Sequence, residues 1–259
     1  MASASLTDKA YKHLQQQLSG GLLLPGTVVS EKKVAVELGI SRTPVGQAIR
    51  QLVAEGLMEQ VPRYGTVVKE ITKEDIEDLY ELREAMEPYA ARKAAAKITK
   101  PHLEQLRILC RSIEQLAEDM DASGIDTLEG ESLRAFLSAD LAFHLYIVRS
   151  AANERMLKIV RESRFVSQVF RMRRARHDLE KAKAVCECHR QILAALEAHD
   201  GDLAAKHMYD HIHRSKVETI AFMEREDGNA LASDSSLGLD LSESIREQLS
   251  RLESASDFE

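Results

Sequence analysis

The sequence predicts a mostly α-helical protein with two parts, an N-terminal winged helix-turn-helix and a C-terminal antiparallel bundle of about six helices. Three observations predict this fold class. Two short helical patterns meet at a glycine near residue 39, and two β-prone runs follow them. From residue 72 onward, apolar residues recur at helical spacing almost without interruption.

The helix-turn-helix is expected between residues 24 and 56. Its first helix ends at Gly39, which suits the left-handed conformation that closes a helix. In the second helix Thr43 is the expected N-cap and Pro44 the first helical residue. The apolar face of that helix is Val45, Ala48, Ile49, Leu52 and Val53, and the opposite face carries Gly46, Gln47, Arg50 and Gln51.

A β-hairpin is expected after Gly56. The runs LMEQV and GTVV are β-prone, and the residues PRYG at 62–65 between them favour a turn. A hairpin in this place forms the wing of a winged helix-turn-helix.

Residues 24–68 resemble the winged helix-turn-helix of GntR-type transcription regulators along their whole length. The matching motifs are PG before the first strand, SE and SRTPV at the starts of two helices, and EGL before the wing. The resemblance implies a homodimer that binds palindromic double-stranded DNA. The resemblance implies DNA contacts from Lys32, Arg42, Thr43 and Gly65, and the polar face of the recognition helix adds Gln47 and Arg50 as candidates.

One residue of the recognition helix departs from the family pattern. Similar proteins have SRTPVRE where this chain has SRTPVGQ, so Gly46 stands in place of an arginine. Because the apolar face of the helix lies elsewhere, position 46 is expected to point outward toward the DNA groove. We expect either an operator that differs from the family half-site at the base that this arginine would read, or weaker binding in which Arg42, Gln47 and Arg50 carry the base readout.

Length and charge indicate two domains and a tail. A DNA-binding part of about 70 residues leaves roughly 190 of the 259, enough for one further domain with a sizeable core. We expect domains at 1–70 and 71–225 and an acidic tail at 226–259. The net charge of −7 is unevenly spread, since residues 1–70 carry eight Lys and Arg against six Asp and Glu, whereas the tail carries two against nine.

Other features narrow the class of protein. The three cysteines form no CxxC pair and are too few for a disulfide framework, and we find neither a signal-peptide core nor an apolar run long enough to span a membrane. A cytoplasmic protein without a membrane partner is expected. The common nucleotide-binding and hydrolase motifs are absent, so we expect no enzymatic activity.

The second domain begins with a capping box formed by Thr72 and Asp75, and Ile76, Leu79, Leu82, Met86 and Tyr89 follow at helical spacing. Later helices are expected at about 132–151, from 153, at about 179–198, and from 202 to near Met223. The tail is expected to be disordered. The alternative is an amphipathic helix with Leu237, Leu241, Ile245, Leu249 and Leu252 on one face.

Four residues of the bundle have the types and spacing of a metal site. Asp140 and His144 are four residues apart and share one helix face, while His189 and His211 lie on two later helices. Three imidazoles and a carboxylate suit Zn²⁺, Ni²⁺, Mn²⁺ or Fe²⁺. The pattern alone is a weak signal, because the chain has nine histidines, including His207 one turn before His211.

Residues 79–95, 139–153 and 188–212 resemble the all-helical ligand-binding domain called FCD, found in the FadR subfamily of GntR regulators. The resemblance implies a divalent metal held by Asp140, His144, His189 and His211, with a small organic acid as effector. Cys188 is a departure, because the pattern has an acidic residue there. Arg83, Asn153 and Arg164 are the candidate effector-binding residues. Alternatively, Arg83 pairs with Glu87, and Asn153 caps a helix.

Three hypotheses remain open. The first is a transcription regulator, expected to be a repressor, whose operator affinity is controlled by a small carboxylate bound at the metal. The second is a metal-free regulator that responds to an apolar or acyl-CoA ligand, which the four metal-ligating residue types disfavour. The third is a helical-bundle metalloenzyme, which is disfavoured because a di-iron site would need paired Glu-x-x-His motifs.

Overall fold

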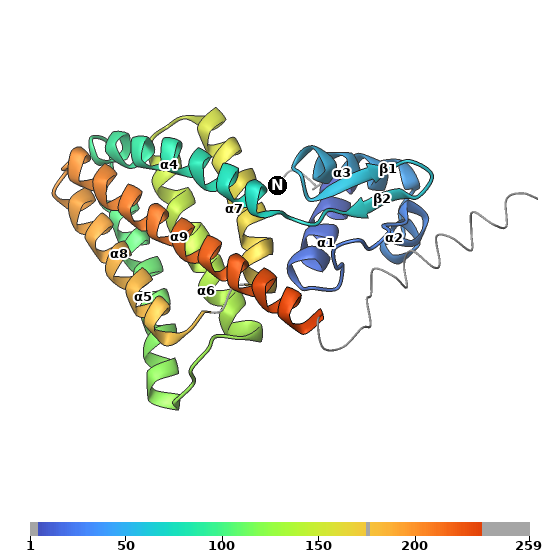
Figure 1. Ribbon diagram of the computed structural model, residues 1–259. Helices are drawn as coiled ribbons and strands as arrows, with labels where there is room; N and C mark the ends of the chain where they lie inside the picture. Colours follow the sequence, from blue (N-terminus) through green and yellow to red (C-terminus); the bar gives the residue numbers. More distant parts are fainter. Residues whose placement is uncertain (1–4, 175–176, 235–259) are drawn as a thin grey trace, which may run out of the picture. The chain divides into compact units, whose positions relative to one another are not determined.

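The computed structural model describes residues 5–174 and 177–234 (Figure 1). Over these residues the chain is mostly helical, with one two-stranded sheet in the N-terminal part, as the sequence predicts. None of the described helices is both long and apolar enough to cross a membrane. A boundary between two compact units falls after Val217, within the last helix.

The first helix, α1 (Leu6–Ser19), is an element that the sequence analysis did not predict. It starts at a capping box in which Ser5 accepts a hydrogen bond from the backbone N–H of Asp8, and the Asp8 side chain accepts one from the backbone of Ser5. Its buried residues recur every fourth position: Ala10, Leu14 and Leu18. This face packs against α3.

The helix-turn-helix consists of α2 (Glu31–Leu38) and α3 (Arg42–Ala54). Gly39 closes α2 in the left-handed conformation with φ of 65°, as predicted. The predicted apolar face of α3 is also confirmed, because Val45, Ala48, Ile49 and Leu52 are buried. These residues pack in the core of the winged domain.

The start of α3 differs from the prediction. The N-cap is Ser41, so Thr43 lies inside the first turn and Pro44 is the third helical residue. A proline is tolerated throughout the first turn, because the backbone N–H groups there have no intrahelical acceptor. The prediction that Thr43 caps the helix was therefore wrong by two residues.

The wing is formed by the antiparallel strands β1 (Met58–Val61) and β2 (Gly65–Val68). Arg63 and Gly65, at the turn, have φ of 70° and 90°. Glycine tolerates such a backbone conformation without strain. A single bridge between Val28 and Val67 ties the segment before α2 to this hairpin.

The bundle consists, over the described residues, of six helices. They are α4 (Lys73–Ala95), α5 (Lys100–Ser123), α6 (Gly130–Ser150), α7 (Glu154–Arg174), α8 (Leu179–Glu197) and α9 (Gly201–Asp234). The predicted capping box at Thr72 is present at the start of α4. Helix α6 packs against α4, α5 and α7, and α5 also packs against α8. Residues on α6 therefore face the middle of the bundle.

The end of α9 differs from the prediction. The helix continues to Asp234, whereas the sequence analysis ended it near Met223 and began the tail at residue 226. The predicted apolar face from Leu237 to Leu252 lies outside the described residues.

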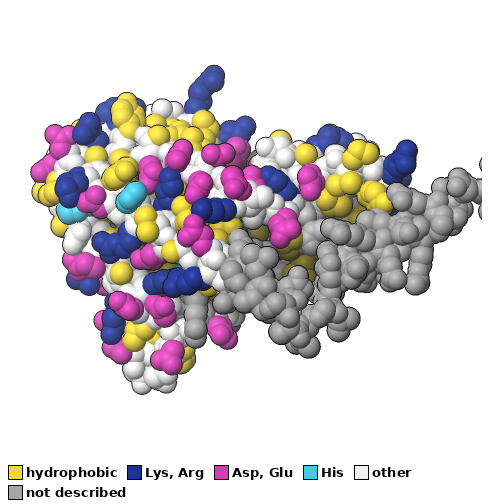
Figure 2. Space-filling model, in the orientation of Figure 1, with side chains coloured by type: hydrophobic (Ala, Val, Ile, Leu, Met, Phe, Trp, Pro, Cys, Tyr) yellow, Lys and Arg dark blue, Asp and Glu magenta, His cyan; other side chains and the backbone are white. Residues whose placement is uncertain are grey.

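The buried face of α4 agrees only in part with the one that apolar spacing predicted, because Ile76 is buried and Leu79 and Met86 are partly buried. Leu82 and Tyr89, both expected inside, are 38% and 54% exposed, whereas Arg83 and Glu87 are almost fully buried. Figure 2 shows hydrophobic side chains gathered over α4 and the start of α7. Hydrophobic periodicity could not predict this rotation of α4, because charged residues are buried only where a partner neutralises them.

Candidate metal centre and DNA-binding face

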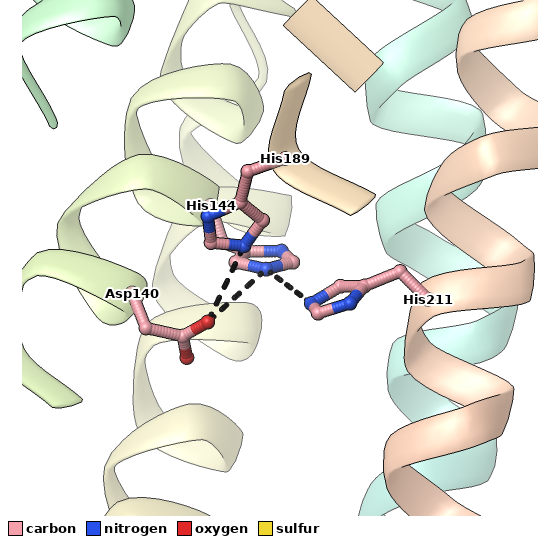
Figure 3. Close-up of side chains that lie close together, drawn as sticks. All are labelled: Asp140, His144, His189 and His211. Atoms are coloured by element: carbon pink, nitrogen blue, oxygen red, sulfur yellow. Dashed lines mark hydrogen bonds and ion pairs between the residues drawn. The ribbon is translucent and has the colours of Figure 1, made fainter. Parts of the chain in front are cut away.

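Asp140, His144, His189 and His211 come together in the interior of the bundle (Figure 3). Helix α6 supplies the first two, α8 the third and α9 the fourth. All four are buried, and one potential ligand atom from each lies within 4.8 Å of the others. The structure thus assembles the four residues that the sequence singled out.

The spacing of the ligand atoms fits a common metal ion. Atoms bound at about 2.1 Å and separated by 90° to 110° lie about 3.0 to 3.4 Å from one another. The Nε2 atoms of His144 and His211 are 3.1 Å apart. The Oδ1 atom of Asp140 lies 3.4 Å from Nε2 of His189 and 3.7 Å from Nε2 of His144. A small contraction around an ion would bring all of them to bonding distance.

His189 gives the strongest test of whether the four residues fit a metal ion. Both of its ring nitrogens are buried and have no hydrogen-bond partner. An unsatisfied buried polar atom is costly, so such atoms are rare in folded proteins. Its Nε2 atom faces Asp140, as expected for a metal ligand (Figure 3). The donor set present here therefore fits a divalent transition-metal ion.

Glu87 fixes the orientation of His144. Its Oε2 atom lies 2.7 Å from Nδ1 of His144. Burial alone would raise the pKa of Glu87, but the charges of Arg164 and Arg83 outweigh burial and hold the pKa well below its usual range. An ionised carboxylate only accepts hydrogen bonds, so Nδ1 of His144 carries the proton and Nε2 presents its lone pair to the other ligands.

The imidazoles also have the protonation state that metal ligation requires. Burial, reinforced by the nearby charge of Arg164, lowers the pKa of His144 to about 3. Burial, together with the closeness of other imidazoles that would repel a second positive charge, lowers the pKa of His211 well below its usual range. Both rings are thus neutral near pH 7, and neutral imidazole is the form that binds a metal.

The sequence analysis did not assign Glu87 to the site, although it is the centre of the surrounding charge network. Its Oε1 atom accepts from Nε of Arg83 and Nε of Arg164, both at 2.9 Å, and its Oε2 atom accepts from Nη2 of Arg164 at 3.0 Å. The available signal was the four-residue spacing of Arg83 and Glu87. That spacing is common on exposed helix surfaces and does not reveal burial.

The three candidate effector residues are placed differently from one another. Arg83 forms the ion pair with Glu87 that the sequence analysis gave as the alternative, and its guanidinium also lies 4.7 Å from the ring centre of Tyr80. Arg164 lies next to the cluster, with Nη1 3.4 Å from Oδ2 of Asp140. Asn153 caps α7 by accepting a hydrogen bond from the backbone of Met156 at 3.1 Å. Their roles toward an effector remain predictions.

The six predicted DNA-binding residues are all exposed: Lys32, Arg42, Thr43, Gln47, Arg50 and Gly65. Gln47 accepts a hydrogen bond of 2.7 Å from the hydroxyl of Thr7 on α1. Arg42 pairs with Glu31 across a distance of 3.2 Å. These polar contacts restrain two side chains of α3 before any DNA is bound.

Gly46 does not have the open surroundings that the sequence analysis expected. It is buried, and a Cβ added to it would lie 2.8 Å from Oε1 of Glu31 and 3.5 Å from Nη1 of Arg50. Position 46 was expected to point outward toward the DNA groove, but in the structure a side chain from the neighbouring helix α2 reaches over it. Spacing along one helix gives no information about such a contact.

Comparison with known protein families assigns each of the two parts of the chain to a family model. Residues 6–68 match the family model for bacterial regulatory proteins of the gntR family, and residues 78–214 match the model for the FCD domain. The chain belongs to the gntR family of regulators with an FCD domain. As expected from the sequence, this family consists of DNA-binding regulators and not of enzymes.

Two relatives illustrate the similarity in sequence. A protein of Paenarthrobacter nicotinovorans named "Probable D-xylose utilization operon transcriptional repressor" is 32% identical over 197 residues, covering 76% of this chain and 80% of the relative. The "Gluconate operon transcriptional repressor" of Bacillus licheniformis is 25% identical over 226 residues, covering 85% of this chain and 88% of the relative.

Solved structures share the fold of this gntR-family chain. The E. coli protein McbR/YncC superposes with a TM-score of 0.70 at 21% identity, covering 86% of this chain and all of that one. A GntR regulator from Rhodococcus sp. RHA1 gives a TM-score of 0.64 at 19% identity, covering 83% of this chain and 97% of that one. At these identities the similarity establishes the arrangement of helices only.

Proposed function

We propose that this gntR-family regulator is a homodimeric repressor whose operator affinity is controlled by a small carboxylate bound beside a divalent metal in the bundle. The observation that carries the proposal is the buried cluster of Asp140, His144, His189 and His211. The printed names of two relatives, the repressors of D-xylose utilization and of the gluconate operon, support the repressor assignment.

The metal part of the proposal rests on His189. Without a metal, Nε2 of this residue is buried, makes no hydrogen bond and has only the 3.4 Å contact to Oδ1 of Asp140. A divalent ion would take the lone pair of His189 together with those of His144 and His211, and Asp140 would supply the carboxylate oxygen. When bound, such an ion offers further coordination positions to oxygen atoms of a ligand.

The charge balance of the site favours an anionic ligand. Glu87 and Asp140 contribute two negative charges, and Arg83 and Arg164 two positive charges, among groups that are nearly all buried. A divalent ion adds two positive charges that these four residues do not offset. Burying uncompensated charge is costly, so a ligand that carries one or two carboxylates is favoured over a neutral or apolar one.

Arg164 is a better candidate for the effector contact than Arg83. Its Nη1 atom lies 3.4 Å from a carboxylate oxygen of Asp140, which places the guanidinium at the edge of the metal cluster. Arg83 donates from Nε to Glu87 and stacks on Tyr80, one step further out. We therefore assign Arg164 to the carboxylate and Arg83 to the support of Glu87.

A metal-free acyl-CoA-responsive regulator is the alternative. It would require an apolar ligand at the centre of the bundle, where this chain places three imidazoles and a carboxylate. The cluster disfavours that alternative.

Metal content and thermal stability test the proposal together. Protein purified and supplemented with Zn²⁺, Ni²⁺ or Mn²⁺ is expected to retain about one equivalent, measured by elemental analysis after dialysis. Alanine at Asp140, His144, His189 or His211 should lower both metal content and melting temperature, because a ligand that binds only the native state stabilises it.

His207→Ala is the matched control. His207 lies one turn before His211 on α9 and is not part of the cluster, so this variant should keep wild-type metal content. Retention of less than about a tenth of an equivalent by the wild type, or full retention by the His189→Ala variant, would contradict the metal site.

A further inference from the structure

A row of three residues runs along the outer side of α3. Arg42, Gly46 and Arg50 are four residues apart and therefore lie on the same face of the helix, one above the other. Both arginines are exposed. The glycine leaves a gap between them, and the two positive charges flank a position that has no side chain.

A carboxylate from the neighbouring helix α2 fills this gap. Oε2 of Glu31 accepts from Nη2 of Arg42 at 3.2 Å. Its Oε1 atom lies only 2.8 Å from the point that a Cβ at position 46 would occupy. The outer row of α3 thus has the charge order positive, negative, positive. A side chain at position 46 would push the Glu31 carboxylate away.

We propose that Glu31 competes with DNA for the guanidinium of Arg42 and thereby restrains the binding of duplexes of any sequence. This inference rests on the proposed repressor function and on the predicted place of Arg42 at the DNA interface. The absence of a side chain at Gly46 is what allows the carboxylate to reach Arg42.

The exposure of the pair indicates that it has little role in folding. The side chains of Arg42 and Glu31 are 69% and 37% exposed, and ion pairs as exposed as this contribute little to stability. The same exposure leaves Arg42 accessible to phosphate oxygens, which dominate the affinity of proteins for DNA. A phosphate must displace the Glu31 carboxylate to gain this contact, and it is also repelled by that carboxylate.

The Glu31→Gln variant tests the proposal in a mobility-shift assay with a random-sequence DNA duplex. Affinity is expected to rise about two- to fivefold, the factor that corresponds to loss of an exposed ion pair. The dependence on salt should steepen by about one phosphate contact. In an Arg42→Ala background the same substitution should give no gain.

Two further variants make the test specific. Gly46→Ala should raise affinity in the same direction, because its Cβ displaces the carboxylate, and it should add nothing once Glu31→Gln is present. Glu37→Gln is the charge-matched control on the same helix, because Glu37 pairs with His13 on α1 and not with α3. Glu37→Gln should not raise affinity for the duplex. Melting temperatures verify that each variant is folded.

The outcomes separate this inference from the function on which it rests. If Arg42→Ala alone leaves affinity unchanged, Arg42 is not at the DNA interface and both statements fail. If Arg42→Ala weakens binding but Glu31→Gln does not strengthen it, or strengthens it equally without Arg42, only the competition is overturned.

Discussion

Single residues of the bundle are tuned by burial and by their charged neighbours. Glu87 is fully buried, yet it remains ionised because Arg83 and Arg164 both donate to it. Its hydrogen bond to His144 orients that imidazole, whereas burial keeps the ring neutral. Removing one of these charged side chains would leave its buried partner uncompensated. This is more damaging to stability than replacing the whole group of buried charges.

The lowered pKa values of two histidines predict how stability of the chelated protein depends on pH. Burial, with the charge of Arg164, lowers the pKa of His144 to about 3, and burial also lowers that of His211. Below the usual histidine pKa of about 6.5 the unfolded chain binds protons that the folded protein does not. Stability should therefore fall as pH drops below this value, by on the order of 1 kcal/mol for His144 at pH 5.5, and His211 should add to the loss.

Urea titrations of chelated protein at a series of pH values measure this effect. His211→Gln should make the decline between pH 7 and pH 5 shallower, since it removes one of the two contributing imidazoles. An equal decline in wild type and variant would show that His211 accepts a proton in the folded state and is not held neutral.

At the scale of elements, α4 illustrates how one helix can serve two purposes. Its inner face carries Arg83 and Glu87 to the metal cluster, whereas Leu82 and Tyr89 remain exposed on another side. Ile159 on the adjacent helix α7 is also 42% exposed. Exposed apolar side chains that cluster in this way are typical of protein interfaces.

We predict that this apolar surface of α4 and α7 is covered by a second copy of the chain. Leu82→Glu combined with Tyr89→Glu should convert a dimer into a monomer in size-exclusion chromatography with light scattering, because two buried charges would face each other across a two-fold interface. Operator affinity should fall when the dimer is lost, since a monomer contacts only one half-site.

The control substitution is Ile108→Glu on α5, at a side chain that is similarly exposed, 44%, on a different helix. It should leave the dimer intact. A dimer that survives the double substitution on α4 would place the subunit interface elsewhere.

At the scale of the whole molecule, regulation requires that the bundle and the winged domain influence each other's binding equilibria. A ligand shifts an equilibrium between two states only by its difference in affinity for them. The relevant quantity is therefore a coupling free energy between acid and DNA, which is typically about 1 to 3 kcal/mol in allosteric proteins.

We predict that a small carboxylate which raises the melting temperature of metal-loaded protein will not do so after chelation. The same acid should change operator affinity about 5- to 150-fold, and the operator should change affinity for the acid by the same factor. Calorimetric titration with and without DNA measures both changes in affinity. Equal stabilisation of loaded and chelated protein would place the acid away from Asp140 and the histidines.

The sequence by itself determined the fold class, the six helices of the bundle and the four residues of the candidate metal site. It could do so because apolar spacing and helix caps act within one helix, and because the i, i+4 pair Asp140 and His144 needs only one helix to share a face. The resemblance to regulators then selected His189 and His211 among nine histidines.

Only the tertiary structure decided which charges are buried and what covers each helix. Glu87 was indistinguishable from a surface residue until α4, α6 and α7 brought His144 and Arg164 to it. Gly46 looked open until the side chain of Glu31 from α2 covered it. Both outcomes depend on contacts between residues distant in sequence, and periodicity within one helix carries no information about its partners.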